Sequence, residues 1–471
     1  MAGMYISHPT EEETTALRQR LRGQLLQAGD AGYHEARRVW NGLIDRRPNW
    51  IVRCSGAGDV IAAVNFARKH DLIVAVKGGG HSYSGISVCD GGLMIDLSPM
   101  KGVRVDPTTR MARAEGGATW HDVDFETQAF GLAVNGAQVS RVGIGGFTLG
   151  GGFGNLMRKL GMTVDNLVSA DVVTADGHLL KASAEEHPDL FWALRGGGGN
   201  FGIVTSFEYQ LHPIGPLIVG GLAGFEMTRT REVVAFFRDY MATAPDELGM
   251  TLAFLTAPPR PFVPDHLHSQ PIVALLPCHC GSIEQGMADL AAVRALHPAF
   301  DTVGPMPYTA LQGLIDESSP YGTQRWCATS GLLDAITDDT VDRIIAHAGA
   351  PSSPFTTTLV VAAGGAAGRI STDATAYAHR QAAFALVIFG AWRGADQDEV
   401  HTTWVRAFSE AMRPAFHGVY VNGLGDEPDR VTEAYPEATY RRLVEIKNRY
   451  DPQNVFRLNQ NIRPTLPSSA C

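Results

Sequence analysis

The chain has 471 residues, enough for more than one hydrophobic core, so two domains are expected. Its formal net charge of −10 argues against nucleic acid as a partner, and no apolar run approaches the ~20 residues of a membrane helix. The first 21 residues lack the basic-then-apolar pattern of a signal peptide. We therefore expect a cytoplasmic protein, or a mature form whose leader is missing.

Cysteine and histidine spacing does not favour a metal site. His266, His268 and the Cys278-His279-Cys280 run do not have the repeated short spacing of structural zinc ligands, so we expect no bound metal. The six cysteines do not form a disulfide framework either, and are expected to be mostly buried free thiols. They are Cys54, Cys89, Cys278, Cys280, Cys327 and Cys471.

The first half of the chain alternates regular elements with three glycine clusters. A helix over 57–70, capped by Asp59, precedes a strand over 72–76 that ends at the first cluster, in VAVKGGGHSYSG (74–85). Strands at 92–97 and around 103–115 and a helix over 119–132 follow. The second cluster is RVGIGGFTLGGGFGNLMRKLG (141–161) and the third is FWALRGGGGNFGIVTSFEY (191–209).

The character of the sequence changes near residue 214. Residues 217 to about 415 contain long β-branched segments that alternate with amphipathic helical patterns, which predicts a largely antiparallel sheet with helices on one face. The overall expectation is an α+β fold. Its predicted parts are residues 1–213, a second domain over 214–415 and a terminal segment over 416–471.

The glycine clusters predict a large phosphorylated cofactor. Glycine lets the backbone approach a ligand, and the exposed N–H groups of such loops bind phosphate. Residues 197–202 match the dinucleotide pattern G-x-G-x-x-G, but a helix precedes them and a strand follows, the reverse of the nicotinamide-binding order. A histidine directly after the first loop would lie beside the cofactor.

The order of these motifs resembles the berberine bridge enzyme-like branch of the FAD-linked oxidases. The matching stretches are VWNGLIDRRPNWIVRC (39–54), VKGGGHSYSG (76–85), residues 142–167, residues 187–209 and RYDPQNVFRLNQNI (449–462). The resemblance implies a flavin domain of the vanillyl-alcohol oxidase (PCMH) type over 1–213, to which 416–471 returns. It also implies a substrate domain over 214–415 with a large antiparallel sheet covered by helices.

The resemblance implies that FAD is bonded to His81, the residue that follows the first glycine loop. Many relatives have a second bond from a cysteine, but Val139 stands at that position and no cysteine lies between Cys89 and Cys278. We therefore expect a single covalent link, as in 6-hydroxynicotine oxidase-like and natural-product-tailoring members. The other residues expected at the cofactor are Val76, Lys77, Gly78, Gly79, Gly80, Ser82, Tyr83, Gly85, Gln138, Val139, Val142, Gly143, Gly145, Gly146, Thr148, Gly150, Gly151, Gly152, Gly154, Gly202, Ile203, Val204, Tyr420, Asn422 and Asn459.

The catalytic base is less well defined by the resemblance. The stretch Tyr420-Val421-Asn422-Gly423 is similar to the family's Tyr-x-Asn-Tyr element, but its second tyrosine, often assigned to substrate deprotonation, is Gly423 here. Tyr420 is the first candidate for the base, and Tyr377 and His379 are further candidates. An amine substrate can react as its own neutral form and need no base.

The implied function is oxidation of a small organic substrate, an amine, alcohol or natural product, by hydride transfer to flavin N5 and reduction of O2 to H2O2. Val142, near the second glycine loop, is consistent with oxidase behaviour. Two alternatives remain: a flavin dehydrogenase that uses another electron acceptor, and a flavin-binding protein without turnover. The chain is expected to be a monomer or a homodimer.

Overall fold

The computed structural model describes residues 9–465. Residues 1–8, part of the stretch on which the expected absence of a signal peptide depends, and Cys471 lie outside this range. The five cysteines inside it are free thiols, and all but Cys327 are buried, which confirms that prediction. No helix between residues 9 and 465 is long and apolar enough to cross a membrane.

The first half contains a small, mostly parallel sheet and a larger antiparallel one. In spatial order, the strands of the small sheet are β1 (Gln24–Leu26), β2 (Trp50–Arg53), β4 (Leu93–Asp96) and β3 (Val74–Lys77). Those of the antiparallel sheet are β5 (Val103–Asp106), β6 (Met111–Glu115), β10 (Ile203–Gln210), β8 (Leu167–Val173) and β9 (Leu179–Ser183). A short pair joins β7 (Leu132–Ala133) to β11 (His212–Pro213).

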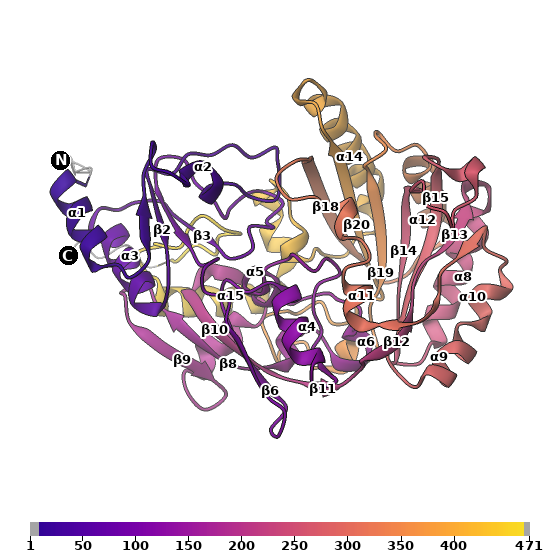
Figure 1. The fold of residues 1–471 in the computed structure, drawn as a ribbon, viewed down its shortest axis with the longest axis horizontal. Coiled ribbons are helices and arrows are strands. Elements are labelled where there is room, and N and C mark those ends of the chain that lie inside the picture. The colour runs from indigo at the N-terminus through magenta and orange to yellow at the C-terminus, as the bar shows by residue number, and fades with distance from the viewer. Residues whose placement is uncertain (1–8, 466–471) are drawn as a thin grey trace.

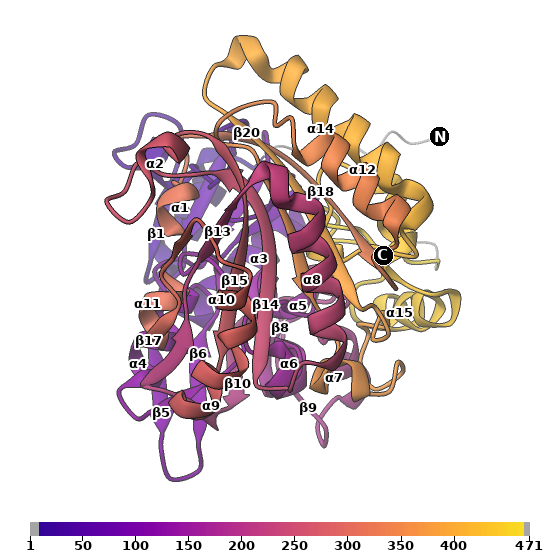
Figure 2. The ribbon, with the colours of Figure 1, turned by 90° about the vertical axis from the view of Figure 1, so that its right-hand side faces the viewer.

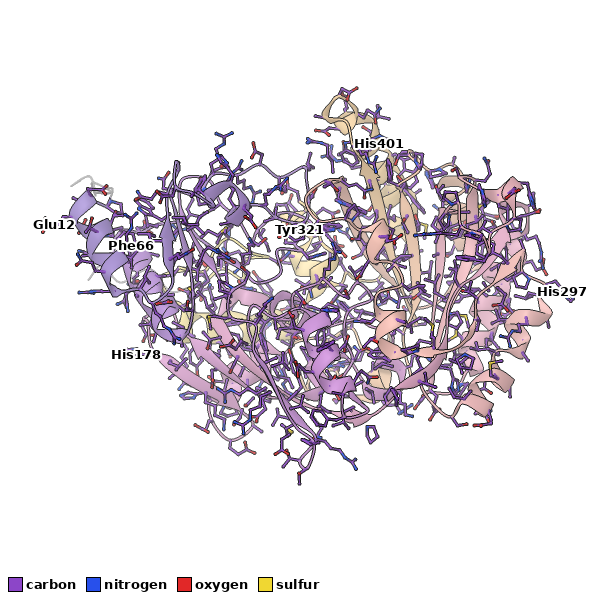
Figure 3. The ribbon with its side chains drawn as sticks, in the orientation of Figure 1. Glu12, Phe66, His178, His297, Tyr321 and His401 are labelled. Carbon is purple, nitrogen blue, oxygen red and sulfur yellow. The ribbon has the colours of Figure 1, made fainter. Side chains whose placement is uncertain are left out.

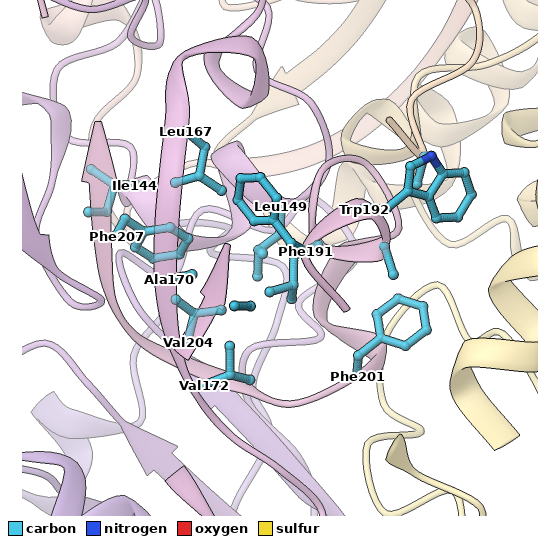
Figure 4. Close-up of a cluster of buried hydrophobic side chains, with 14 of the residues drawn as sticks. Ile144, Leu149, Leu167, Ala170, Val172, Phe191, Trp192, Phe201, Val204 and Phe207 are labelled. Atoms are coloured by element: carbon cyan, nitrogen blue, oxygen red, sulfur yellow. The ribbon is translucent and has the colours of Figure 1, made fainter. Parts of the chain in front are cut away.

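Helices pack on these sheets around more than one hydrophobic cluster. They are α1 (Glu11–Arg20), α2 (Tyr33–Ala36), α3 (Ala57–Lys69), α4 (Trp120–Gln128), α5 (Ile144–Leu149), α6 (Met157–Leu160) and α7 (Pro188–Leu194). Figure 4 shows Val172 and Phe207 of the antiparallel sheet packed with Phe191 of α7. The expected Asp59 cap is wrong: α3 begins at Ala57, and the Asp59 carboxylate accepts N–H bonds from Ser55, Arg22 and Gly23.

The second half is dominated by one antiparallel sheet, called here the large sheet. Within the described residues its strands are β12 (Leu217–Gly220), β13 (Ala223–Glu226), β14 (Leu248–Thr256), β15 (Pro271–His279), β16 (Phe300–Asp301), β17 (Gly304–Pro307), β18 (Arg325–Leu333), β19 (Thr357–Ala362) and β20 (Phe384–Trp392). The helices of this half are α8 (Thr230–Thr243), α9 (Ile283–Asp289), α10 (Ala291–Ala295), α11 (Tyr308–Gln312), α12 (Asp338–Ala348), α13 (Ala366–Arg369) and α14 (Asp398–Met412).

The two faces of the large sheet have different neighbours. Because side chains alternate along a strand, Leu252, Val360 and Leu386 point to one face and pack against α8, α12 and α14. Figure 2 shows these helices covering that side. The residues between them in sequence point to the other face, toward the first half of the chain.

The end of the chain returns to the first half, as Figure 1 shows in yellow. Helix α15 (Glu437–Tyr450) packs against α7, and its Lys447 is buried with Asp451. The Lys447 ammonium also donates to the carbonyl oxygens of Asn200 and Phe456, at 2.8 and 3.0 Å. This pair therefore ties residues 451–460 to the third glycine cluster. The α+β class is confirmed, whereas the limits at 213 and 415 stay a prediction.

A buried ion pair fixes the second half to the first. Arg380, between β19 and β20, donates two hydrogen bonds of 2.8 Å to Asp165, and both side chains are almost fully buried. The Asp165 carboxylate also accepts the Met162 N–H. Removal of either partner would leave an unpaired buried charge.

We expect Arg380→Met to lower the free energy of unfolding by about 3–5 kcal/mol, because it strands the Asp165 carboxylate. Arg369→Met is the matched control, since the Arg369–Asp246 pair is exposed and contributes at most about 1 kcal/mol. Urea unfolding followed by tryptophan fluorescence measures both. Equal midpoints for the two variants would contradict this account of the interface.

Candidate functional site

A cavity of about 1110 Å³ lies between the two halves of the chain. One wall consists of the glycine loops and the terminal segment 456–460, and the opposite wall is the inner face of the large sheet. The volume exceeds the ~300–1,000 Å³ typical of small-molecule sites. The cavity can therefore hold a cofactor and a second molecule together.

The first two glycine loops are in direct backbone contact. A Cβ on Gly79 would lie 2.4 Å from the Gly143 nitrogen, and a Cβ on Gly143 would lie 2.3 Å from the Gly79 nitrogen. Any side chain at either position would push the loops apart. Gly80 has a φ of +70°, which favours glycine and directs the chain toward His81.

His81 lines the cavity next to an aromatic cluster. Its ring stacks on Trp40, with centroids 5.2 Å apart, and Trp40 stacks on Trp326 of β18 at 4.6 Å. Tyr321 contacts His81 edge-on and lies where the two halves meet (Figure 3). The Trp40 indole N–H donates to Ser319 Oγ at 2.9 Å, which fixes the stack.

The His81 imidazole is neutral and incompletely bonded. Burial, reinforced by the positive charge of Arg141, lowers the pKa of His81 to about 3. Its Nε2 is buried and has no hydrogen-bond partner among the described residues. A neutral ring keeps a lone pair on one nitrogen, so this histidine can act as a nucleophile toward an electrophilic carbon.

Most of the predicted cofactor residues lie on the cavity wall. These are Val76, Gly78, Gly79, Gly80, Ser82, Tyr83, Gln138, Val139, Val142, Gly143, Gly145, Gly146, Gly202, Ile203, Val204, Tyr420, Asn422 and Asn459. Their contact with a cofactor stays a prediction, but the fold brings them around one space. Residues that the sequence did not single out also line it, including Trp40, Asn155, Thr251, Trp326 and Phe456.

The remaining predicted residues lie behind the wall. The Lys77 ammonium donates to the Ala36 carbonyl at 2.6 Å, and the Thr148 hydroxyl bonds to that of Tyr209 at 2.8 Å. The others are glycines where a side chain would collide with a neighbour, such as Asn422 at Gly150 and Ile44 at Gly85. They are Gly85, Gly150, Gly151, Gly152 and Gly154, and the structure gives each a packing role.

Tyr420 lies on the cavity wall and its phenol oxygen accepts hydrogen bonds. The donors are the Gly152 N–H at 3.0 Å and the Asn422 amide at 2.9 Å. Burial raises the pKa of Tyr420 to about 12, and these hydrogen bonds act in the opposite direction because they stabilise the phenolate. The arrangement suits a group that gives up its proton and then takes one from a ligand.

Tyr377 and His379 are placed differently. Tyr377 does not line the cavity; its hydroxyl donates to the His379 carbonyl at 3.3 Å, and burial raises the pKa of Tyr377. The His379 ring bonds to the Glu433 carbonyl at 2.9 Å. Neither side chain reaches the space where a substrate would bind, so this geometry favours Tyr420.

The region 48–183 matches the FAD binding domain family, and residues 419–463 match the family described as berberine and berberine like. An FAD-linked oxidoreductase of Dictyostelium discoideum is 30% identical over 94% of this chain and 95% of its own. The chain belongs to the berberine bridge enzyme-like FAD-linked oxidoreductases. The predicted family is thus confirmed, and the protein is an FAD-dependent enzyme.

Other relatives agree in fold along the whole chain. The (R)-6-hydroxynicotine oxidase of Paenarthrobacter nicotinovorans is 28% identical over 94% of this chain and 97% of its own. The crystal structure of 6-hydroxy-D-nicotine oxidase from Arthrobacter nicotinovorans superposes with a TM-score of 0.84 at 27% identity, over 94% of this chain and 98% of that one. Xylooligosaccharide oxidase from Myceliophthora thermophila gives 0.85 at 22% identity, over 96% of this chain and 99% of that one, a likeness of fold.

Gly423, where the resemblance leads us to expect the family's second tyrosine, packs against Ser330. A Cβ on Gly423 would lie 2.1 Å from the Ser330 hydroxyl oxygen and 2.7 Å from the Ser330 Cβ. Ser330 on β18 thus occupies the space that a side chain at 423 would need. The lost tyrosine therefore cannot be restored by changing residue 423 alone.

We expect Gly423→Ala to destabilise the protein by about 1–3 kcal/mol through overpacking. In a Ser330→Gly background the same change should have almost no effect, because the colliding atoms are gone. Thermal unfolding of the wild type, both single variants and the double variant gives the coupling energy. Additive effects would show that the two residues do not compete for this space.

Proposed function

We propose that this enzyme is an oxidase that carries FAD on His81 through one covalent bond and oxidises a small organic substrate. Bound FAD would accept a hydride at N5 from the substrate carbon and pass both electrons to O2, which with two protons gives H2O2. The wall fits the cofactor because glycine leaves backbone at its surface: a Cβ on Gly146, which lines the cavity, would meet no protein atom within 4 Å and would enter the free space. The chain's own residues supply the tether, the proton acceptor and the substrate wall.

The observation that carries the proposal is that the His81 ring is neutral and that its Nε2 has no hydrogen-bond partner among the described residues. His81 is half-buried and neutral, and its buried Nε2 without a hydrogen bond is unfavourable unless that nitrogen has another partner. A bond to the flavin's 8α carbon would provide that partner. Its formation would replace one methyl C–H bond and the imidazole N–H bond, releasing two protons, with the two electrons passing through the flavin to O2. The stack of Trp40 and Trp326 keeps the ring at the cavity wall before the bond forms.

A single bond is supported by the second glycine segment. Val139 lines the cavity where relatives with two bonds have cysteine, and the nearest cysteines in sequence, Cys89 and Cys278, are both buried. Neither is among the residues that line the cavity. The flavin would then be held at its benzenoid end by His81 and elsewhere by backbone contacts alone.

We expect His81→Ala to release its flavin on acid precipitation, whereas the wild-type pellet stays yellow. The variant should still bind FAD at neutral pH, because the glycine walls are intact. His178→Ala, at a solvent-exposed histidine, is the control and should retain flavin. Flavin in the wild-type supernatant would exclude the covalent bond.

Tyr420 is the proposed proton acceptor. It would take the O–H or N–H proton while the adjacent C–H hydride leaves, so that a carbonyl or imine forms. The donors from Gly152 and Asn422 stabilise the phenolate that must be present before the proton moves. Phe153, whose ring lies 4.6 Å from that of Tyr420, excludes water from one side of it.

We expect flavin reduction by an alcohol to become faster with rising pH up to about 12, the pKa of Tyr420, because only the phenolate accepts a proton. Asn422→Leu should raise this pKa and slow reduction about 10-fold at any lower pH, since a hydrogen bond to a charged group is worth ~1.5–3 kcal/mol. Tyr420→Phe should remove the pH dependence. Anaerobic stopped-flow measurements, with the aromatic alcohol that bleaches the flavin fastest in a screen, test this.

The acceptor that takes the electrons from the reduced flavin distinguishes the proposed oxidase from a dehydrogenase or a binding protein. Val142 lines the cavity beside the second glycine loop, as expected for an enzyme that admits O2. Peroxide formation during turnover supports the oxidase, whereas bleaching without peroxide indicates a dehydrogenase and no bleaching a binding protein. We also propose that the enzyme is a monomer or a homodimer and that it is located in the cytoplasm.

A further inference from the structure

The cavity wall formed by the large sheet is mostly apolar. Ala253 and Leu255 of β14, Leu359 and Val361 of β19, and Val387 of β20 all point into it. Among the described residues, the charged side chains on the cavity wall are Arg260, Glu317 and Arg393, and all three are solvent-exposed. Charge therefore lies at the mouth of the cavity.

One polar cluster interrupts this apolar surface. The Gln138 amide nitrogen donates to Asn155 Oδ1 at 3.0 Å and to Thr251 Oγ1 at 2.8 Å. The three side chains come from different segments: the loop after β7, the loop after α5, and strand β14. We call them the Gln138 cluster, and all three line the cavity.

The cluster has polar groups whose hydrogen-bonding capacity is not used within the described residues. A glutamine amide has two N–H donors, and both are used within the cluster. Beyond these two bonds, Gln138 Oε1 and the Asn155 NH2 group form no hydrogen bond with residues 9–465. If both amides are turned over, the donor and acceptor exchange places, so the cluster offers one of each in either orientation.

We propose that Gln138 and Asn155 recognise the adjacent C=O and N–H of a neutral amide or lactam on an otherwise apolar substrate, with Thr251 fixing their orientation. This inference rests on the proposed function, because it names the substrate class of the same cavity. It assigns Gln138, predicted from the sequence to lie at the cofactor, to the substrate instead. A lactam edge accepts one hydrogen bond and donates one, which satisfies both free groups of the cluster.

Other classes of substrate fit less well. A carboxylate would face Gln138 Oε1 with no cation beside it, since Arg260 pairs with Glu317 and Arg393 stacks over Phe355 at the mouth. An ammonium group at the cluster would meet no carboxylate. A pure hydrocarbon would fill the apolar wall but leave both amide groups unpaired once water is displaced.

The test compares two flat bicyclic probes, 2-quinolone with a lactam edge and naphthalene without one. Isothermal titration calorimetry on the purified holoenzyme should show 2-quinolone binding about 30-fold tighter, the ratio that two neutral hydrogen bonds give. Gln138→Leu should reduce the ratio to about 1, and Thr251→Val should reduce it several-fold. Thr357→Val is the matched control, because it removes a hydroxyl from the same face that has no bond to Gln138, and it should keep the ratio.

Acid-stable flavin, measured on the same samples, separates failure of this inference from failure of the proposed function. Equal binding of the two probes to protein that retains flavin would overturn the lactam site and leave the oxidase proposal standing. Tighter binding of 2-naphthoate or of naphthalen-2-ylmethylammonium than of 2-quinolone would also overturn it. Selectivity for 2-quinolone that survives Gln138→Leu but falls in Thr357→Val would place recognition elsewhere on the sheet.

Discussion

The site depends on the approach of two backbones at Gly79 and Gly143. Each nitrogen lies within about 2.4 Å of the position that a Cβ on the other residue would take, so only glycine permits this contact. The contact places His81, two residues after Gly79, on the same wall of the cavity as the loop around Val142. Glycine loops of this kind can bind a pyrophosphate through backbone N–H groups.

The opposite wall follows from the two faces of the large sheet. Each central strand presents every second side chain to the helices α8, α12 and α14 and the others to the cavity. Burial of one face against helices supplies stability, so the inner face can vary with the substrate while the sheet stays intact. The Arg380–Asp165 pair then keeps this face in register with the flavin wall.

The residues on the glycine-loop wall of the cavity could be predicted from the sequence better than those on the wall formed by the large sheet. Glycine clusters and a following histidine are local signals, and the residues from Gly78 to Tyr83 do line the cavity. Glycines such as Gly150 and Gly152 belong to the same clusters but serve packing against Asn422 and Thr163, and spacing alone does not separate the two roles.

Prediction of the residues on the large-sheet wall requires knowledge of strand pairing, which a single sequence does not contain. Thr251 and Asn155 are about a hundred residues apart in sequence, and both accept a hydrogen bond from Gln138. Strand β18, which carries Trp326 and Ser330, was not among the predicted elements, since its small and polar residues hide a strand pattern. The continuous apolar runs at 252–255 and 359–361 indicate strands but do not tell which side chains face the cavity.

The most direct test of this account is a crystal structure of the holoenzyme. We expect continuous electron density from the His81 ring to the flavin, with the pyrophosphate against Gly78–Gly80 and the isoalloxazine facing the inner side of β14 and β19. Flavin density outside this cavity, or a His81 ring separated from the flavin, would contradict it.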